Sequence, residues 1–367
     1  MMLLILYNAV NAQHDPSTLY NAVNTQNNQA ALHKAVNAQH NHVTFKVCIT
    51  AFYNLENFYD TTNNPMVNDD DFTVGGIKHY DQKIYQDKIN HLAKVISEIG
   101  TEISVDGVAI LGVAEIENDT VLKDLIHHPL LAKRNYQFVH YDSKDIRGID
   151  VALLYNPNYF KIESSGTAHV RLPNYNKNKF ETRDILWVNG LLDGEPVYIF
   201  VNHWPSKRGD EAKTTASRSA AAASCRTELN KIFKKDPSAK IIVMGDLNDN
   251  PDSYPITKVL ESKASPIQLK QGELYNPWAV LYQKGFGTLA NQDSWSLFDQ
   301  ILLSEAWISP NQSGFYFYRQ QIFKRLYMVE NSGRYKGYPM RTWDGNNYRG
   351  GYSDHFPTYI ILLKNTH

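Results

Sequence analysis

The chain is built from short apolar runs, each of which ends in polar residues. The clearest runs are KVCITAFYNLEN, GVAILGVAEIEN, DVALLYNP, PVYIFVNHWPS, KIIVMGDLNDNP, FDQILLS and TYIILLK. Each is rich in Val, Ile, Phe or Tyr and stops at turn-forming residues such as Asn, Asp or Pro, which is typical of strands in buried sheets. The sequence therefore predicts a fold organised around β-strands.

Amphipathic helices are predicted between these strands. Over residues 82–99, Ile and Leu recur every three or four residues, and Gly100 supplies a stop signal. A second helix is expected to have Asp210 as its N-cap and to run to Phe233. Because strands and helices alternate over residues 46–367 without a linker, we expect one α/β domain of two packed sheets flanked by helices.

Residues 1–45 have a different texture. A 13-residue repeat places AVNAQ or AVNTQ at positions 9, 22 and 35, among Asn, Gln and His residues. Such polar repeats bury too little apolar surface to offset the entropy lost on ordering. We expect a disordered, low-complexity extension that takes no part in catalysis.

Composition excludes several classes of protein. The formal net charge is -1, so the chain lacks the overall positive field of a nonspecific nucleic-acid binder. The two cysteines, Cys48 and Cys225, support neither a disulfide framework nor a cysteine zinc site. No apolar run is long enough for a transmembrane helix. We expect a soluble monomer, cytoplasmic by default, although the short apolar start leaves export open.

The residues that close the strands carry chemistry. They are Asn54 and Glu56, Glu115 and Glu117, Asn202 and His203, Asp246 and Asn248, Asp299, and Asp354 and His355. Singly, such asparagines and histidines are more often turn-forming or structural residues. Together, converging acids repel one another unless a cation lies between them. Carboxylate and amide oxygens without cysteines suit Mg²⁺ or Mn²⁺.

Phosphoester hydrolysis needs such a set of groups. The transition state gathers negative charge on the phosphate oxygens, so electrostatic stabilisation must be strong. The reaction also needs an in-line water, and an aspartate next to an asparagine, such as Asp246 and Asn248, can orient that water and accept its proton.

The ordered motifs AFYNLENF, GVAEIEN, VNHWPS, GDLNDNP, FDQILLS and SDHFP resemble those of the endonuclease/exonuclease/phosphatase superfamily, over about residues 47–364. This resemblance implies a four-layered α/β sandwich whose two sheets are mainly antiparallel. It also implies a metal site, in which Glu115 is the principal ligand, Asn54 and Glu56 complete or orient the metal's water shell, and Asp354 is a further carboxylate.

The resemblance further implies four catalytic roles. Asp246 resembles the acid that activates the attacking water, and Asn248 resembles the amide that positions it. His355 is similar to the imidazole that stabilises the transition state when protonated, and Asp299 to the acid that orients it.

Substrate contacts are expected from a third group. Asn202 and His203 resemble the pair that contacts the scissile phosphate. The cations that follow, Lys207, Arg208, Lys213 and Arg218, either clamp a phosphate or form a solvated helix face, and we assign Arg208 and Arg218 to the substrate. Residues 315–349 form an insert rich in aromatic and basic residues. Either its rings stack on the bases of DNA or RNA while its cations bind phosphates, or its aromatic residues pack the loop and its cations are solvated.

These observations favour a divalent-metal-dependent phosphodiesterase, most plausibly a nuclease. Within enzymes, the alternative is a phosphomonoesterase or a lipid or inositol phosphodiesterase. In another class, the alternative is a non-catalytic phosphate- or nucleic-acid-binding module on the same fold. A binding module predicts a gap at Glu115, Asp246 or His355, and none of these residues is missing.

Overall fold

The computed structural model describes residues 44–173, 181–309 and 314–366. The predicted extension, residues 1–45, lies almost wholly outside this range and stays a prediction. The chain divides into two compact units, of which one is Val47–Leu363 and the other holds Met1–Lys46 and Lys364–His367. Within the second unit, the Thr44 hydroxyl donates to the Thr366 carbonyl at 3.0 Å.

The first large sheet has six strands in the order β14-β17-β1-β2-β4-β3. Their bounds are β1 (Thr44–Phe58), β2 (Val108–Ile116), β3 (Gln137–His140), β4 (Asp150–Tyr155), β14 (Tyr316–Ile322) and β17 (Thr358–Thr366). Strands β1 and β2 are parallel, whereas β2 with β4, β3 with β4 and β14 with β17 are antiparallel.

The second large sheet has seven strands in the order β5-β6-β7-β8-β13-β10-β9. Their bounds are β5 (Phe160–Ala168), β6 (Ile185–Leu192), β7 (Glu195–His203), β8 (Lys240–Asp246), β9 (Ser262–Lys263), β10 (Leu274–Tyr275) and β13 (Asp299–Ser304). Only the pairs β7–β8 and β9–β10 are parallel among its described strands. Two small hairpins complete the strands, β11 (Leu289–Asn291) with β12 (Ser294–Ser296) and β15 (Trp343–Asp344) with β16 (Asn347–Tyr348).

The helices are α4 (Gln82–Glu98), α5 (Asp119–Ile126), α6 (Glu211–Lys235) and α7 (Trp278–Gln283). Shorter turns are 3-10 at Asp70–Phe72, Ala132–Arg134, Pro266–Gln268, Glu305–Trp307 and Leu326–Met328, and π at Pro255–Val259. Both predicted helices are confirmed. The side chain of Asp81 caps α4 by accepting from Ile84 N, and Asp210 caps α6 by accepting from Lys213 N. None of the helices in the described ranges is long and apolar enough to cross a bilayer.

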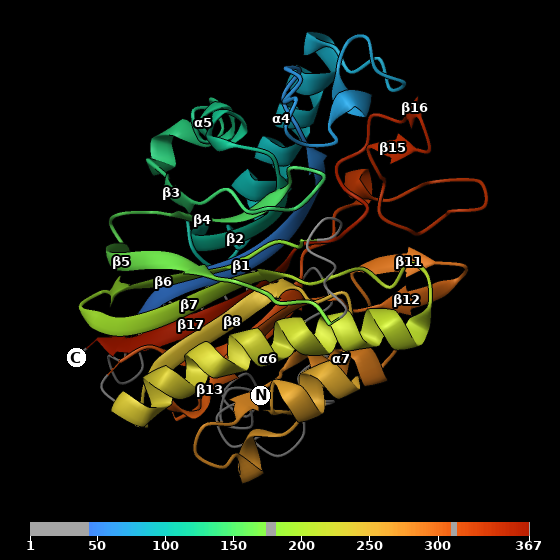
Figure 1. The fold of residues 1–367 in the computed structure, drawn as a ribbon. Helices are drawn as coiled ribbons and strands as arrows, with labels where there is room; N and C mark the ends of the chain where they lie inside the picture. The colour runs from blue at the N-terminus through green and yellow to red at the C-terminus, as the bar shows by residue number, and fades with distance from the viewer. Residues whose placement is uncertain (1–43, 174–180, 310–313, 367) are drawn as a thin grey trace. The chain divides into compact units, whose positions relative to one another are not determined.

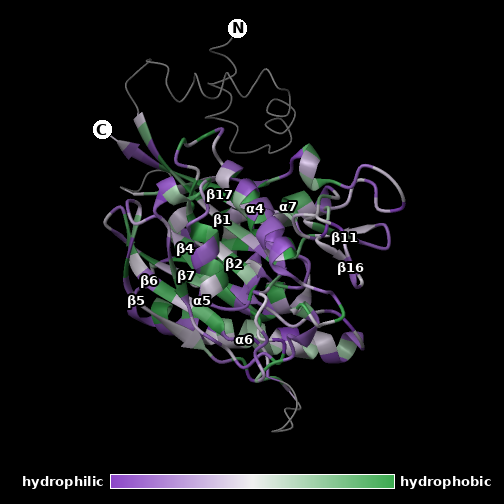
Figure 2. Ribbon diagram, turned by 90° about the horizontal axis from the view of Figure 1, so that it is seen from above, coloured by the Kyte–Doolittle hydropathy of each residue, from purple (hydrophilic) through white to green (hydrophobic). Residues whose placement is uncertain are grey.

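Strand alternation builds the layers. In β1, Ile49 and Ala51 pack in the cluster that contains the α4 side chains, whereas Cys48 and Phe52 pack in the cluster between the two sheets. In β8, Ile242 and Met244 contribute to the inter-sheet cluster, and their neighbours face α6. Helices α4 and α5 therefore cover one sheet and α6 covers the other, and the apolar residues gather on the strands (Figures 1 and 2). The predicted sandwich of two mainly antiparallel sheets flanked by helices is confirmed.

The segment 315–349 is only partly an insert. Its first part is β14, an edge strand that pairs with β17, and Phe315, Phe323 and Trp343 are buried. Tyr318 and Tyr335 remain exposed. The buried aromatic residues of this segment therefore pack within the protein, as one of the two alternatives predicted, because their rings belong to the hydrophobic core.

Candidate active site

Two strand pairings bring predicted residues together where strands β7 and β8 end and the antiparallel strand β13 begins. Asp246, the last residue of β8, is the register partner of His203 on one side and of Asp299 on the other. Residues opposite each other on neighbouring strands lie close in space. Asp246 therefore lies at the centre of the group.

Hydrogen bonds fix the Asp246 carboxylate. Asn54 Nδ2 donates to its Oδ2 at 3.0 Å, and the Asn248 backbone N–H donates to its Oδ1 at 2.9 Å. The imidazole Nε2 atoms of His203 and His355 lie 3.7 Å and 3.8 Å from Oδ2. Burial raises the pKa of Asp246 to about 6. A carboxylate with this pKa is mostly ionised at neutral pH and is more basic than an ordinary aspartate, so it can accept a proton.

His355 and Asp299 form a buried pair. His355 Nδ1 and Asp299 Oδ2 are 2.7 Å apart, which leaves Nε2 directed at Asp246 and Asp354. Burial of the ring opposes its charging, but Asp299, Asp246 and Asp354 together raise the pKa of His355 well above its usual value. The ring is thus held as an imidazolium ion at neutral pH.

His203 is held in the opposite state. Burial, followed by the nearby Arg183 and Arg147, lowers the pKa of His203 well below its usual value. Its Nε2 lies 3.8 Å from Glu115 Oε1, so the neutral ring lies between Glu115 and Asp246. Two histidines whose pKa values diverge within one site are characteristic of divided acid and base roles.

The residues predicted to hold a metal border the central group, whose closely spaced ligand atoms come from Asp246, Asp299 and His355. Glu115 Oε2 accepts from Asn57 N at 2.8 Å, whereas its Oε1 accepts no hydrogen bond from any described residue. Asp354 is partly exposed, and its carboxylate lies 3.8 Å from His355 Nε2. Such under-coordinated carboxylates beside buried Asp246 and Glu56 fit a hard divalent cation, which would relieve their mutual repulsion.

Glu56 has an additional structural role. Its carboxylate accepts from the backbone N–H groups of Thr342 at 2.7 Å and Trp343 at 3.3 Å. The buried Lys88 of α4 donates to the Thr342 hydroxyl and, at 3.0 Å, to the Tyr352 carbonyl. Glu56 therefore holds the backbone of Thr342 and Trp343, at the start of β15, next to the site.

Three of these residues have left-handed backbone conformations. The φ values are 51° at Glu56, 61° at Glu115 and 48° at Asn248. Non-glycine residues adopt this region at a cost, and such outliers cluster at functional sites. Three of the candidate site residues thus share this uncommon backbone conformation.

Two arginines that the sequence did not single out also face the site. Arg183 Nη1 donates to Asp145 Oδ2 at 2.9 Å, and its Nη2 donates to the Trp204 carbonyl at 2.8 Å. Arg147 Nε lies 3.6 Å from Asp145 Oδ1, and the charge of Glu115 contributes to raising the Arg147 pKa. Positive charge thus lies beside Glu115 and His203.

Three of the residues predicted to contact the substrate make no hydrogen bond to Glu115, Asp246 or Asp354 in the described ranges. The Asn202 side chain is buried, accepts from Trp204 Nε1 at 3.1 Å and donates to the Met244 carbonyl at 3.3 Å. Arg218 is fully buried, and its Nε donates to Asp249 Oδ2 at 2.8 Å. Arg208 is exposed and has no bond within the described ranges. The side chains of Asn202 and Arg218 are thus bonded to partners within the protein, and the assignment of all three residues to the substrate stays a prediction.

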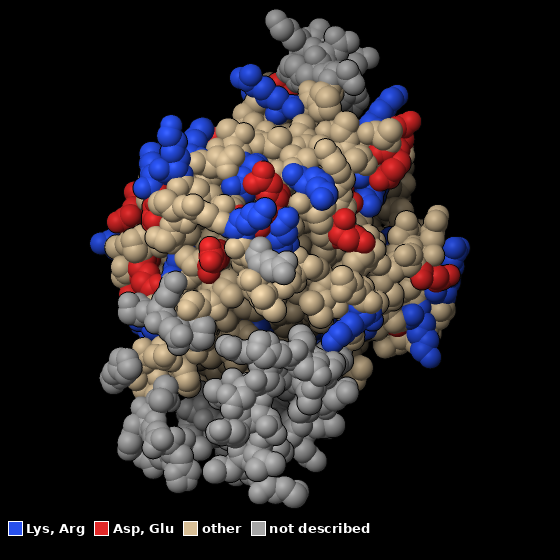
Figure 3. All heavy atoms as spheres, turned by 90° about the horizontal axis from the view of Figure 1, so that it is seen from below, with Lys and Arg blue, Asp and Glu red and all other residues tan. Residues whose placement is uncertain are grey.

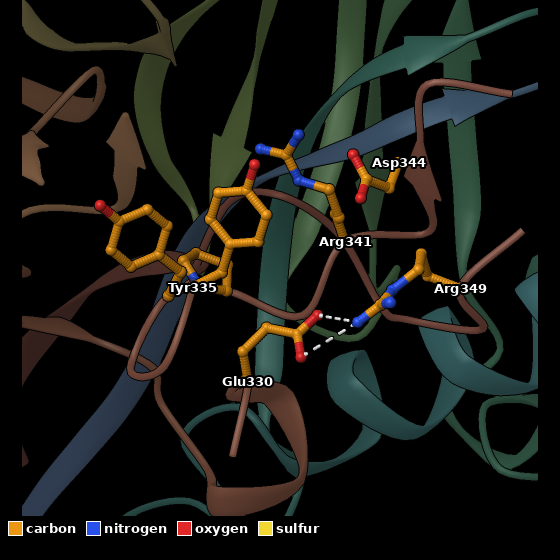
Figure 4. Close-up of a pocket in the computed structure, with 7 residues that line it drawn as sticks. Glu330, Tyr335, Arg341, Asp344 and Arg349 are labelled. Carbon is orange, nitrogen blue, oxygen red and sulfur yellow. Dashed lines mark hydrogen bonds and ion pairs between the residues drawn. The ribbon is translucent and has the colours of Figure 1, made fainter. Parts of the chain in front are cut away.

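A shallow pocket borders the segment that Glu56 fastens. Its lining residues are Glu330, Tyr335, Tyr338, Pro339, Arg341, Asp344 and Arg349. Figure 4 shows Arg349 paired with Glu330 and Arg341 separate from that pair. None of the catalytic candidates lines this pocket, which is linked to them through Thr342 and Glu56.

The titration of Glu56 gives a stability prediction. Burial, followed by the charge of Asp354, raises the pKa of Glu56 to about 7. A carboxyl with a raised pKa stabilises the fold while protonated, and that stability is lost as the pH rises through the folded-state value. Without metal, the melting temperature is expected to fall as the pH rises from 4.5, the ordinary pKa of a glutamate, to about 7, and to level off above that. The lost free energy is on the order of a few kcal/mol, at about 1.4 kcal/mol per pKa unit.

Differential scanning fluorimetry in EDTA measures this loss. Glu56→Gln should flatten the profile, and Mg²⁺ should flatten it in the unaltered chain because a bound cation stabilises the carboxylates. A metal-free melting temperature that does not change with pH in this window would contradict the assignment.

A model of the endonuclease/exonuclease/phosphatase family matches residues 48–364. No curated protein matches the chain in sequence. Among solved structures, humanized D. rerio TDP2 is 15% identical, with a TM-score of 0.52 over 86% of this chain and 98% of that one.

Two structures from Bacteroides thetaiotaomicron are also similar. A mannosyl-6-phosphatase is 17% identical, with a TM-score of 0.52 over 86% of this chain and 99% of that one. An endonuclease/exonuclease/phosphatase family protein is 17% identical, with a TM-score of 0.53 over 88% and 97%. At these identities the likeness concerns the fold. Proteins of the family are metal-dependent phosphoesterases. Since the family model covers most of the chain, this protein belongs to the endonuclease/exonuclease/phosphatase family.

Proposed function

We propose that the protein is a divalent-metal-dependent phosphodiesterase, with a nucleic acid as its preferred substrate class. The central placement of Asp246 carries the proposal, because the carboxylate is held by Asn54 and Asn248 with a neutral imidazole on one side and a charged one on the other. A binding module needs no such division of protonation states.

Each residue then has a step to perform. Asp246 accepts a proton from the attacking water, whose oxygen forms the new bond to phosphorus, while Asn248 orients that water. His203 and the imidazolium of His355 hydrogen-bond the phosphate oxygens as charge develops on them, and Asp299 holds the His355 ring. The bond from phosphorus to the leaving oxygen breaks, and that oxygen takes up a proton from His355 or from solvent.

Glu115, Asn54, Glu56 and Asp354 would hold Mg²⁺ or Mn²⁺. When bound, the metal supplies Lewis-acid stabilisation of the charge on the phosphate oxygens. Basic and acidic side chains are interspersed on the face shown in Figure 3, so the charge on that face does not favour a polyanion. Attraction of a nucleic acid is therefore assigned to local cations at the site and the exposed aromatic residues Tyr318 and Tyr335.

A substrate panel tests this proposal. The purified chain should be assayed with Mg²⁺ or Mn²⁺ against plasmid DNA, RNA, bis-p-nitrophenyl phosphate, p-nitrophenyl phosphate and inositol phosphates. We expect turnover of the diesters that EDTA abolishes. Absence of metal-dependent turnover on every substrate would favour the binding module, and turnover of monoesters alone would refute the diesterase.

A phosphomonoesterase is the second candidate, and the arginine pair is the observation that favours it. The Arg147 side chain is 41% exposed beside Glu115 and His203, so its guanidinium is available to the extra charge of a monoester. Asp145 holds both Arg147 and the buried Arg183 in place. A dianionic phosphate gains more from such a cation than a monoanionic diester does.

Arg147→Ala is expected to raise KM by about 10- to 100-fold, the range for a lost hydrogen bond to a charged group. If the protein is a diesterase, KM for the diester rises with the same factor as KM for the monoester; a larger rise for the monoester favours the second candidate. Lys161→Ala is the matched control, because Lys161 pairs with Leu191 toward the opposite end of the sheet from His203. An unchanged KM for both substrates in Arg147→Ala would remove this residue from the site.

A further inference from the structure

A second group of ligand atoms surrounds His140, and none of the catalytic candidates belongs to it. His140 is the last residue of β3, Asp150 is the first residue of β4, and Asp142 lies in the loop between them. One ligand atom from each of these three residues lies within 4.8 Å of the others. Asp119, the first residue of α5, contacts the opposite side of the ring.

The orientation of the His140 ring is fixed by Asp119. Nδ1 lies 2.9 Å from Asp119 Oδ1, and a carboxylate at that distance makes Nδ1 the nitrogen that carries the proton. Histidines that ligate metals almost always donate their other ring N–H to a carboxylate or carbonyl in this way. Nε2 is then the atom available to a ligand.

Nε2 is buried and has no hydrogen-bond partner among the described residues. The side chain is only 3% exposed, and Nε2 faces Asp150 Oδ2 at 3.6 Å and Asp142 Oδ1 at 3.9 Å. Charged N–H···O bonds are about 2.7–2.9 Å long, so these separations are too long for an imidazolium ion bonded to either acid. They are close to the separation of about 3.4 Å expected for two ligands at 2.0–2.2 Å from one tetrahedral ion.

Charge at the cluster is also unbalanced. Three carboxylates meet one imidazole, and the cation nearest to them in the described ranges is Lys123, whose Nζ lies 3.7 Å from the far oxygen of Asp119. Burial opposes charging of the ring, yet the carboxylates of Asp150 and Asp119 raise the pKa of His140. The cluster therefore attracts positive charge, which a proton supplies in part.

We propose that His140, Asp142 and Asp150 form a second divalent-metal site, distinct from the catalytic one. A ligand set of one imidazole nitrogen and two carboxylates suits Zn²⁺ or Mn²⁺ better than Mg²⁺ or Ca²⁺, which prefer oxygen alone. Asp150 is buried and fixed by the Ser143 backbone N–H at 3.1 Å, whereas Asp142 is exposed. Water would complete the coordination on the exposed side.

The place of this site in the chain gives it a consequence. His140 and Asp150 are the two ends of the loop that carries Asp145 and Arg147. A bound ion would brace both ends of that loop, and with them the guanidinium that faces Glu115 and His203. The metal at this site would thus stabilise the loop that positions Arg147 for substrate binding, and it would take no part in the reaction itself.

Calorimetric titration of the metal-stripped full chain with Zn²⁺ alone tests the proposal. Measurements in a Glu115→Ala background weaken the catalytic site, and His140→Ala in that background is expected to lose one equivalent of Zn²⁺. His169→Ala is the matched control, because His169 makes the same 2.9 Å contact with Asp184 but belongs to no such cluster in the described ranges. Equal stoichiometry in Glu115→Ala and Glu115→Ala/His140→Ala would overturn the site.

Two further variants avoid the risk that loss of the buried ring unfolds the protein. Asp142→Asn changes an exposed side chain and should weaken Zn²⁺ binding by at least about tenfold, and Asp119→Asn by about 10- to 100-fold, as for partners that orient a metal ligand. If neither variant changes the affinity, the cluster is a proton-stabilised ion pair and the proposal fails.

Discussion

An Asp246→Asn variant is expected to lower kcat by about 10²- to 10⁴-fold, the contribution of a positioned general base. Asparagine keeps the size of the side chain and can still accept from Asn54 or from Asn248 N, but it cannot take the proton of the attacking water. The assay is metal-dependent hydrolysis of bis-p-nitrophenyl phosphate, with circular dichroism to show that the variant is folded.

The pH profile separates a lost base from a damaged fold. Because the Asp246 pKa is raised to about 6, kcat of the unaltered enzyme should rise through this region as the carboxylate ionises, and the variant should lack that rise. Asp252→Asn, the same substitution at an exposed acid nearby in the chain, should leave kcat unchanged. Wild-type kcat in Asp246→Asn would rule out the assigned base.

Loss of the imidazolium should have an effect of similar size. His355→Gln is expected to lower kcat by about 10²- to 10⁴-fold. The physical reason is that the charged ring stabilises negative charge in a buried site, where an uncharged amide does so poorly. In the unaltered enzyme, kcat should also fall at alkaline pH, where the ring loses its proton, and the variant should lack this alkaline fall.

Asp299→Asn distinguishes the ring's charge from its mere presence. The variant keeps a hydrogen-bonding partner for His355 Nδ1 but removes the charge that contributes most to raising the His355 pKa. The alkaline limb of the profile should therefore move to lower pH while the limb assigned to Asp246 remains. An alkaline limb at the same pH in Asp299→Asn would show that this acid does not control the ring.

Much of the fold follows from local sequence. The apolar part of each run named from the sequence forms a strand, because burial on both faces demands continuous apolar residues that end at turn formers. The starts of the two longer helices are also local signals, because the side chains of Asp81 and Asp210 cap them by accepting from backbone N–H groups three residues later. The less apolar strand β5 and the edge strand β14 escaped notice, because tertiary pairing stabilises them more than composition does.

The site was predictable only where side chains follow directly from a strand end. Asn202 and His203 are neighbours in β7, so alternation directs them to opposite faces and only His203 reaches Asp246. Arg147 and Arg183 come from separate loops and meet at Asp145, a contact that depends on how the two sheets pack. No local sequence pattern indicates that these two arginines bind the same aspartate.

The attachment of Thr342 and Trp343 to Glu56 has a consequence for engineering substrate choice. The backbone of these two residues, and no side chain of the pocket, provides the anchor. The side chains of residues 330–341 that have no partner elsewhere can therefore vary while the N–H groups at 342 and 343 keep their acceptor; Glu330, Tyr338 and Met340 are excepted, because they contact Arg349, Asp293 and the core. Libraries that vary Tyr335 and Arg341 but keep Glu56 and Tyr338 are expected to change the lining of the pocket while the contacts of Glu56 remain.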